Sequence, residues 1–182
     1  MKEATFAERL SAAPRPAEAA AAKRRLAGLV AEDAAAPLAP LVERKKTRDL
    51  LLGIADHSPY LWGLISEDPA RLARLLGEAP EAALDRLIAA ISARRDADES
   101  ELMRALRLAK REAALLIALA DLGGVWDVVE VTEALSRFAD AAVSAALRFL
   151  LSDYARAGRL ILDPDAPDIE RDSGLVVLAL GK

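Results

Sequence analysis

Two long apolar stripes separated by a glycine pair constrain the fold more than any other feature of this sequence. Both stripes advance in alternating steps of four and three residues, which places one apolar face along an α-helix. Their positions are Leu102, Leu106, Ala109, Ala113, Leu116 and Ala120, and then Val128, Val131, Leu135, Phe138, Ala142, Ala145 and Phe149. Gly123-Gly124 lies between them, where a helix can end and the chain can turn back. We therefore predict a long antiparallel helical hairpin.

The details of this hairpin follow from the same pattern. The stretch from Ala113 to Ala120 is apolar on nearly every side, so it is predicted to be the most deeply buried helical segment. A helix from Val128 to Ala157 would be about 45 Å long, and a break near Ser152 is expected.

Composition extends the helical prediction to the whole chain. Hydrophobic residues make up 53% of the 182 residues and aromatic residues only 4%, so the core must consist of Ala, Leu, Val and Ile. Ala and Leu favour helices, whereas strands prefer β-branched and aromatic residues. The predicted fold class is mostly α, a multi-helix bundle.

Proline and cap signals mark the shorter helices. Ser58-Pro59 and Asp68-Pro69 each place a capping oxygen before a proline at the first helical position, and Pro80 opens a third helix that reaches about residue 93. Upstream, we predict one helix entered through Pro14 and Pro16, a proline-containing linker over residues 32–40, and a helix over residues 41–55.

Several classes of protein are excluded or disfavoured by residue counts. There is no cysteine, which excludes disulfides, thiolate metal sites and a cysteine nucleophile, and His57 is the only histidine. No apolar run approaches the about 20 residues that cross a bilayer, and no secretory signal is visible at the N-terminus. The net charge of −4 disfavours nucleic acid as a partner. A soluble cytoplasmic protein is the expectation.

Three groups of polar residues are candidates for a site. The acidic segment within residues 159–173 offers carboxylates for Ca²⁺ or Mg²⁺, but the calcium-loop pattern fails because Asp168 stands where glycine is needed. A solvated linker is the favoured interpretation of that segment. His57 ends a helix, where it satisfies terminal carbonyls more readily than it serves catalysis. The basic cluster from Arg44 to Arg48 is interpreted as a solvated face, with a partner-protein surface as the alternative.

The last nine residues, "GLVVLALGK", differ from everything before them. Residues 174–182 are predicted to form a strand that ends in the glycine turn Gly181-Lys182. The phosphate-binding P-loop pattern is absent, because its glycine spacing and its Ser or Thr after lysine are missing. A strand that leads into a glycine turn still brings backbone N–H groups towards phosphates. The predicted division is a helical subdomain over 1–158, an acidic linker over 159–173 and this strand with its turn.

Three stretches together resemble one family, the bifunctional glutamine synthetase adenylyltransferases/adenylyl-removing enzymes. They are "HSPYLWGLISEDPARLARLL", "LRLAKREAALLIALADLGGVWDVVEVTEALSRFADAAV" and "SGLVVLALGK", within residues 57–182. The resemblance implies an enzyme with two polymerase-β-like nucleotidyltransferase domains, and it makes residues 174–182 the first strand and phosphate turn of a truncated domain of this kind. One domain attaches AMP from ATP to a tyrosine of glutamine synthetase, and the other removes it by phosphorolysis. The lysine after Gly181 and the start at Met1 resemble the N-terminal, adenylyl-removing half.

The resemblance also sets expectations for the site. It implies Mg²⁺ and ATP, ADP or phosphate as cofactors, and glutamine synthetase and a PII-type regulatory protein as partners. In this family the Gly-Lys turn is followed by Glu-Leu-Asn and by the metal-holding Ser-Asp-x-Asp, which lie beyond this sequence. Only Gly181 and Lys182 match the catalytic pattern, as phosphate-turn residues, so this chain alone is expected to hold no catalytic or metal residue and to be an inactive scaffold. The alternative is a stand-alone helical protein-interaction module.

Overall fold

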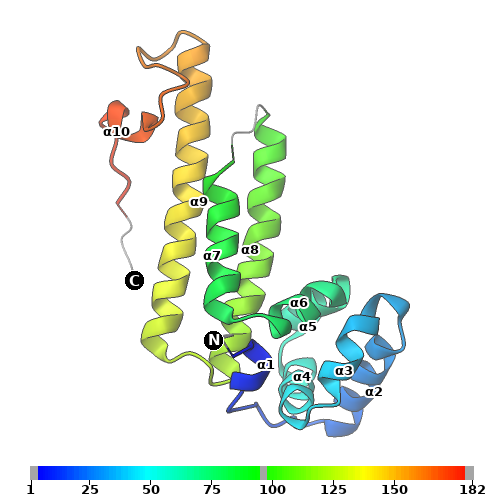
Figure 1. The fold of residues 1–182 in the computed structure, drawn as a ribbon. Helices are drawn as coiled ribbons and strands as arrows, with labels where there is room; N and C mark the ends of the chain where they lie inside the picture. The colour runs from blue at the N-terminus through cyan, green and yellow to red at the C-terminus, as the bar shows by residue number, and fades with distance from the viewer. Residues whose placement is uncertain (1–3, 95–97, 179–182) are drawn as a thin grey trace.

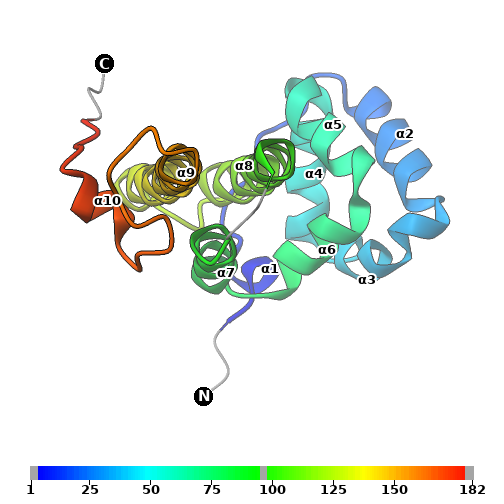
Figure 2. The same ribbon diagram turned by 90° about the horizontal axis from the view of Figure 1, so that it is seen from above.

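A bundle of three helices, two of them long, forms the central part of the molecule. The computed structural model describes residues 4–94 and 98–178. The bundle consists of α7 (Pro80–Ser92), α8 (Glu99–Leu122) and α9 (Val128–Arg156), which pack on one another pairwise (Figure 1). Seen from above, the shorter N-terminal helices lie on one side of the bundle and α10 lies on the opposite side, against α9 (Figure 2).

The remaining helices occupy the two flanks of the bundle. They are α1 (Phe6–Arg9), α2 (Ala19–Val30), the 3₁₀ helix η1 (Asp33–Leu38), α3 (Ala39–Val42), α4 (Lys45–His57), α5 (Pro59–Glu67), α6 (Pro69–Gly77) and α10 (Ile169–Ser173). One buried cluster runs from the N-terminal helices through α4 and α6 into α7 and α8, so the two parts share a core.

The predicted helical hairpin is confirmed. Gly123 and Gly124 end α8, and Gly124 has a φ of 59°, a value that glycine adopts without strain. Asp127 then caps α9 by accepting hydrogen bonds from the N–H groups of Val129 and Glu130. Most of the stretch from Ala113 to Ala120 is buried, as expected, whereas α9 continues through Ser152 without the expected break.

The short helices confirm the cap signals and correct the predicted linker. Ser58 and Asp68 accept hydrogen bonds from the N–H groups of Leu61 and Arg71 at 3.3 and 2.9 Å. Residues 32–40 are not a free linker, because η1 and α3 begin there and η1 packs against α6. Ala35 and Leu38 of η1 are fully buried, so burial of these apolar side chains determines the structure of the proline-rich stretch.

The predicted C-terminal strand, and with it the expected start of a polymerase-β-like domain, is wrong for the residues that the structure describes. Gly174 ends α10 in the left-handed conformation, with a φ of 68°, and residues 175–178 belong to neither helix nor strand. A strand is formed by hydrogen bonds to a neighbouring strand. The described residues contain no strand, so residues 175–178 have no strand to pair with, and their side chains are exposed. Gly181 and Lys182 lie outside the described residues.

An extended segment, which we call the strap (residues 10–18), crosses from α1 to α2. The N–H groups of Ser11 and Ala12 donate to the carbonyl oxygen of Gly123 at 2.9 and 3.0 Å, and the Ser11 hydroxyl donates to that of Gly124 at 2.7 Å. Further along, the strap passes over Gly53 of α4, where the carbonyl of Pro14 occupies the space that a Cβ would need. The strap therefore joins the turn of the hairpin to α4.

Candidate functional site

Asp56 and His57, at the end of α4, hold the strap. The Asp56 carboxylate accepts hydrogen bonds from the backbone N–H groups of Ala17 and Glu18 at 2.6 and 3.1 Å. The Glu18 and Ala17 N–H groups lower the pKa of Asp56, and they outweigh the raising effect of burial. The His57 Nε2 lies 2.8 Å from the carbonyl oxygen of Arg15. The geometry of His57 is thus that of a structural contact at a helix end.

Glu81 joins three separate parts of the chain. Its carboxylate accepts hydrogen bonds from Arg9 of α1 at 2.6 Å and from the indole N–H of the buried Trp126 at 2.7 Å. Burial by itself raises the pKa of Glu81, but the hydrogen bonds from Arg9 and Trp126 outweigh it, so this pKa lies below its ordinary value. The charged form of Glu81 therefore stabilises the junction between α1, α7 and the hairpin turn.

This junction gives a pH-dependent prediction. Because folding lowers the pKa of Glu81, its stabilising effect is present above the unfolded-state value of about 4.3 and is lost as the pH falls through the folded-state pKa. Glu81→Gln is expected to lower the free energy of unfolding by about 1 kcal/mol or less at pH 7, since the side chain is half exposed. Urea unfolding should show this difference shrinking below pH 4.

Asp140→Asn on α9 is the matched control, because Asp140 is exposed in the middle of its helix and its carboxylate pairs with no other side chain within the described residues. It should change the stability little at any pH. A Glu81→Gln effect that is equally large at pH 7 and at pH 3 would contradict the assigned role of the ionised carboxylate.

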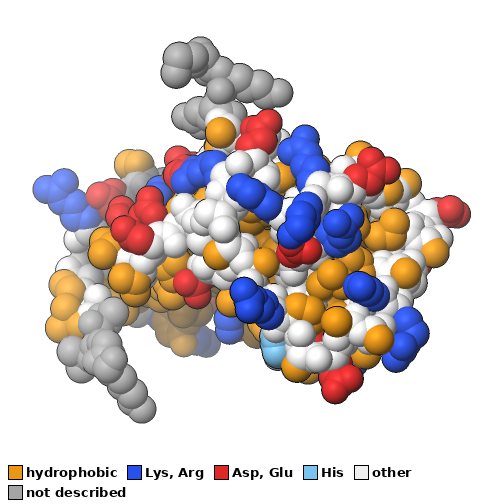
Figure 3. All heavy atoms as spheres, turned by 90° about the horizontal axis from the view of Figure 1, so that it is seen from below, with side chains coloured by type: hydrophobic (Ala, Val, Ile, Leu, Met, Phe, Trp, Pro, Cys, Tyr) orange, Lys and Arg blue, Asp and Glu red, His pale blue; other side chains and the backbone are white. Residues whose placement is uncertain are grey.

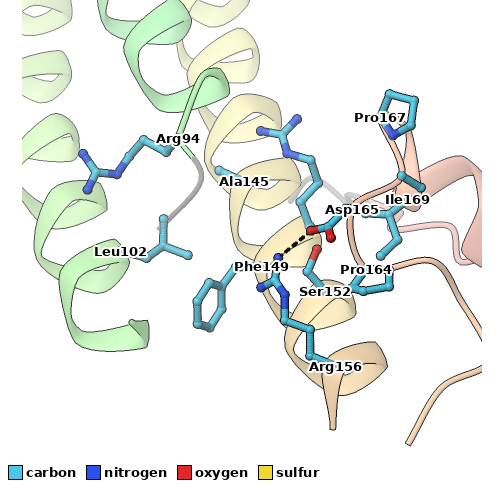
Figure 4. Close-up of a pocket in the computed structure, with 12 residues that line it drawn as sticks. Arg94, Leu102, Ala145, Phe149, Ser152, Arg156, Pro164, Asp165, Pro167 and Ile169 are labelled. Atoms are coloured by element: carbon cyan, nitrogen blue, oxygen red, sulfur yellow. Dashed lines mark hydrogen bonds and ion pairs between the residues drawn. The ribbon is translucent and has the colours of Figure 1, made fainter. Parts of the chain in front are cut away.

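A pocket of about 210 Å³ lies where α9 meets the segment before α10 (Figure 4). Arg148 crosses its wall: one amino group donates to the Ser92 carbonyl oxygen at 3.0 Å and the other lies 3.3 Å from the Glu170 carboxylate. Arg156 pairs with Asp165 at 3.0 Å. These contacts tie the ends of α7 and α9 to α10, so the arginines of the pocket serve as cross-links.

The acidic segment is accordingly not a set of free carboxylates. Asp165 and Glu170 pair with arginines, and Asp168 caps α10 by accepting from the N–H of Arg171. Asp163 accepts a hydrogen bond from the backbone N–H of Asp165 at 3.0 Å. Within residues 4–94 and 98–178, no three His, Asp or Glu side chains are grouped so that they could hold a metal ion.

The most extensive unpartnered feature is an apolar stripe on α9, which we call the outer face (Val128, Leu135, Val143 and Leu150). These side chains are 74%, 51%, 44% and 47% exposed. Their spacing of seven or eight residues aligns them along about 33 Å of helix. At about 100° per residue, the charged residues of α9 between these positions fall elsewhere around the helix, so the outer face carries no charge.

The sequence pattern placed Val128 and Leu135 in the core, and this is wrong. The face of α9 that packs on α7 and α8 contains Ala145 and the partly buried Phe138, as predicted, together with Ala134. The signal for a second face was present in the sequence, as apolar residues that recur at 128, 135, 143 and 150, but it overlaps the first stripe. Leu175 to Leu178 are also exposed, so two apolar surfaces remain uncovered.

These features define a helical unit in which many charged residues form ion pairs with one another and in which apolar side chains are exposed. The profile of the glutamate-ammonia ligase adenylyltransferase family matches residues 49–182, and the chain belongs to that family. None of the helices in the described residues is long and apolar enough to cross a membrane.

The curated relatives are bifunctional glutamine synthetase adenylyltransferases/adenylyl-removing enzymes. The protein from Xanthobacter autotrophicus is 52% identical over 136 residues, which cover 74% of this chain and 14% of the relative. That from Rhodopseudomonas palustris is 45% identical and covers 98% of this chain and 19% of the relative. The protein from Bradyrhizobium diazoefficiens is 44% identical, and the match covers 98% of this chain and 18% of the relative. The chain thus spans less than a fifth of these relatives. No solved structure matches it significantly.

Proposed function

We propose that this chain is the helical portion of an enzyme that attaches AMP to glutamine synthetase and removes it again. The observation that carries the proposal is the identity of 44–45% across nearly the whole chain to relatives with that name. The proposed enzyme takes ATP for attachment and phosphate for removal, with Mg²⁺ to neutralise the phosphate charge. Gly181 and Lys182 are proposed as phosphate contacts, and a PII-type protein as a second partner in the cytoplasm.

The role that we propose for the helices is to support the rest of that enzyme. The outer face of α9 and the apolar side chains from Leu175 to Leu178 are exposed in this chain, and the relatives are more than five times longer. Full burial of a Val or Leu side chain contributes about 1.5–3 kcal/mol, so four such residues on one face form a strong contact. Their proposed occupant is polypeptide of the same enzyme.

Activity measurements separate the parts of this proposal. The full-length protein encoded by the gene should transfer AMP from ATP to glutamine synthetase and should release ADP from the modified enzyme in the presence of phosphate. The chain of 182 residues should do neither. Turnover by this chain alone would refute its scaffolding role, and a full-length protein without either activity would favour the helical interaction module.

A pair of charges on the outer face tests the support role. Leu135→Glu combined with Val143→Glu should leave the stability of the isolated chain within about 0.5 kcal/mol, because both side chains are half exposed. In the full-length enzyme the same pair should lower activity or the thermal midpoint, since two charges would be buried. Asp140→Lys, a change of charge on another side of α9, is the control. If the double substitution leaves the full-length enzyme as unaffected as the isolated chain, burial of this face is refuted.

A further inference from the structure

A groove with a basic rim lies between the strap, α2 and α4. Its volume is about 480 Å³, and its lining includes Arg15 of the strap, Lys23 of α2, and Lys45 and Lys46 of α4. Figure 3 views the molecule from below and shows Lys and Arg side chains gathered on this face. Proline, alanine and leucine side chains form the apolar part of the lining, with Pro14, Pro16 and Leu52 among them. The groove is thus apolar within and positive at its edges.

Most of this positive charge is uncompensated. Lys45 pairs with Asp49 at 2.6 Å, whereas no ion pair joins the side chains of Arg15, Lys23 or Lys46 to an acid within the described residues. The arginines around the bundle behave differently, since Arg74, Arg86, Arg111, Arg137, Arg148 and Arg156 each face a carboxylate. The whole chain has a net charge of −4, so the excess of positive charge is local to this face.

The placement of these cations is electrostatically unfavourable for the fold. Lys45 and Lys46 begin α4, next to Arg44 and Arg48, and the first turn of α4 contains no acidic residue. Cations at a helix N-terminus are repelled by the helix dipole, usually by a few tenths of a kcal/mol each. Of these cations, only Lys45 pairs with an acidic side chain within the described residues, so most of this repulsion is not offset inside the fold. A negatively charged occupant of the groove would do so.

The lining distinguishes between kinds of anion. Phosphate groups are usually cradled by backbone N–H groups or by the fork of an arginine. In the strap, the N–H groups of Ser11, Ala12, Ala17 and Glu18 already donate within the protein, and Pro14 and Pro16 have none. Three of the four cations are lysines, which act as separate point charges on flexible stems. This arrangement fits carboxylates that are spread along a chain, with apolar contacts between them.

We propose that this groove binds an extended acidic peptide segment of a protein partner. Its carboxylates would pair with Lys23 on one side and with Lys46 on the other, while Arg15 meets it from the strap. The intervening side chains would lie on Pro14, Pro16 and Leu52. This docking site is separate from the outer face of α9, and it does not depend on the enzymatic activity proposed above.

Fluorescence anisotropy with a labelled peptide of alternating glutamate and alanine tests the proposal on the 182-residue chain. Binding should be saturable and should weaken as salt screens the charges. Lys23→Glu combined with Lys46→Glu should weaken it by about tenfold or more, because like charges then face each other. Arg104→Glu combined with Lys110→Glu, the same charge change on exposed positions of α8, is the matched control and should leave the affinity nearly unchanged.

Four results would overturn the proposal, and three of them are measured with the peptide. They are the absence of saturable binding, an equal loss of affinity in the control variant, and displacement of the peptide by ADP or inorganic phosphate at lower concentration than by unlabelled peptide. The last result would assign the groove to phosphate groups instead. Tighter binding of single-stranded DNA than of the peptide would assign it to nucleic acid.

Discussion

Replacing Gly53 by alanine is expected to destabilise the protein by about 2 kcal/mol. Gly53 lies within α4, where alanine normally stabilises a helix by about 1 kcal/mol relative to glycine. A Cβ at this position, however, would lie 2.3 Å from the carbonyl oxygen of Pro14 and 3.0 Å from its carbonyl carbon. The strap is fixed on both sides of Pro14 by hydrogen bonds to Gly123 and Asp56, so it has little freedom to move away. The clash should therefore outweigh the gain in helix propensity.

Gly63→Ala is the matched control for this prediction. Gly63 lies within α5, and nothing is found within 4 Å of a Cβ built there. The substitution should stabilise the protein by about 0.5–1 kcal/mol, through helix propensity alone. Urea unfolding at one pH measures both variants against the original chain. Equal stabilisation by both substitutions would mean that the strap does not rest on α4 in solution.

The second large effect is expected for Phe6→Ala. Phe6 is fully buried although it belongs to a helix of only four residues, and its N–H donates to the carbonyl oxygen of Glu78 at 2.8 Å. Removal of a buried phenyl ring usually lowers the free energy of unfolding by about 3–5 kcal/mol. Phe6→Leu, which fills part of the space, should have a clearly smaller effect. The free energy of unfolding of both variants is obtained from the denaturant midpoint, and the slope of the transition is checked to be unchanged.

Tyr60→Ala is the control for loss of an aromatic ring at the surface, since Tyr60 is 60% exposed. Its effect should stay within about 0.5 kcal/mol. A loss below about 1 kcal/mol for Phe6→Ala would indicate that α1 is detached from the core.

The features that were predictable from sequence are those with a local signal. Ser58, Asp68 and the Gly123-Gly124 pair act on residues close to them in the chain, and the structure confirms the caps and the turn. The linker predicted over residues 32–40 is wrong, because its two prolines indicate an irregular segment locally, whereas burial of Ala35 and Leu38 depends on helices elsewhere in the chain. The strand at 174–182 was mispredicted for its described part because pairing depends on a partner strand rather than on the apolar run itself.

Much less of the candidate site could be predicted. Glu81 and Trp126 are 45 positions apart in the sequence, and Asp56 and Ala17 are 39 positions apart. No periodicity in the sequence reveals either hydrogen bond. The outer face of α9 was not predicted, because the apolar residues of two helix faces overlap in one sequence pattern. The resemblance to the adenylyltransferases was visible from three stretches, and the family match confirms it. Gly181 and Lys182 stay a prediction.

The strap also has a consequence for how the protein is made. Ser11 is hydrogen-bonded to Gly124, 113 positions later in the chain. During synthesis, α8 and its glycine turn must therefore leave the ribosome before the strap can form its hydrogen bonds to them. Local helices form early and distant contacts late. The beginning of this polypeptide is thus among the last parts to settle, and until then Phe6 and Leu10 remain exposed to chaperones and proteases.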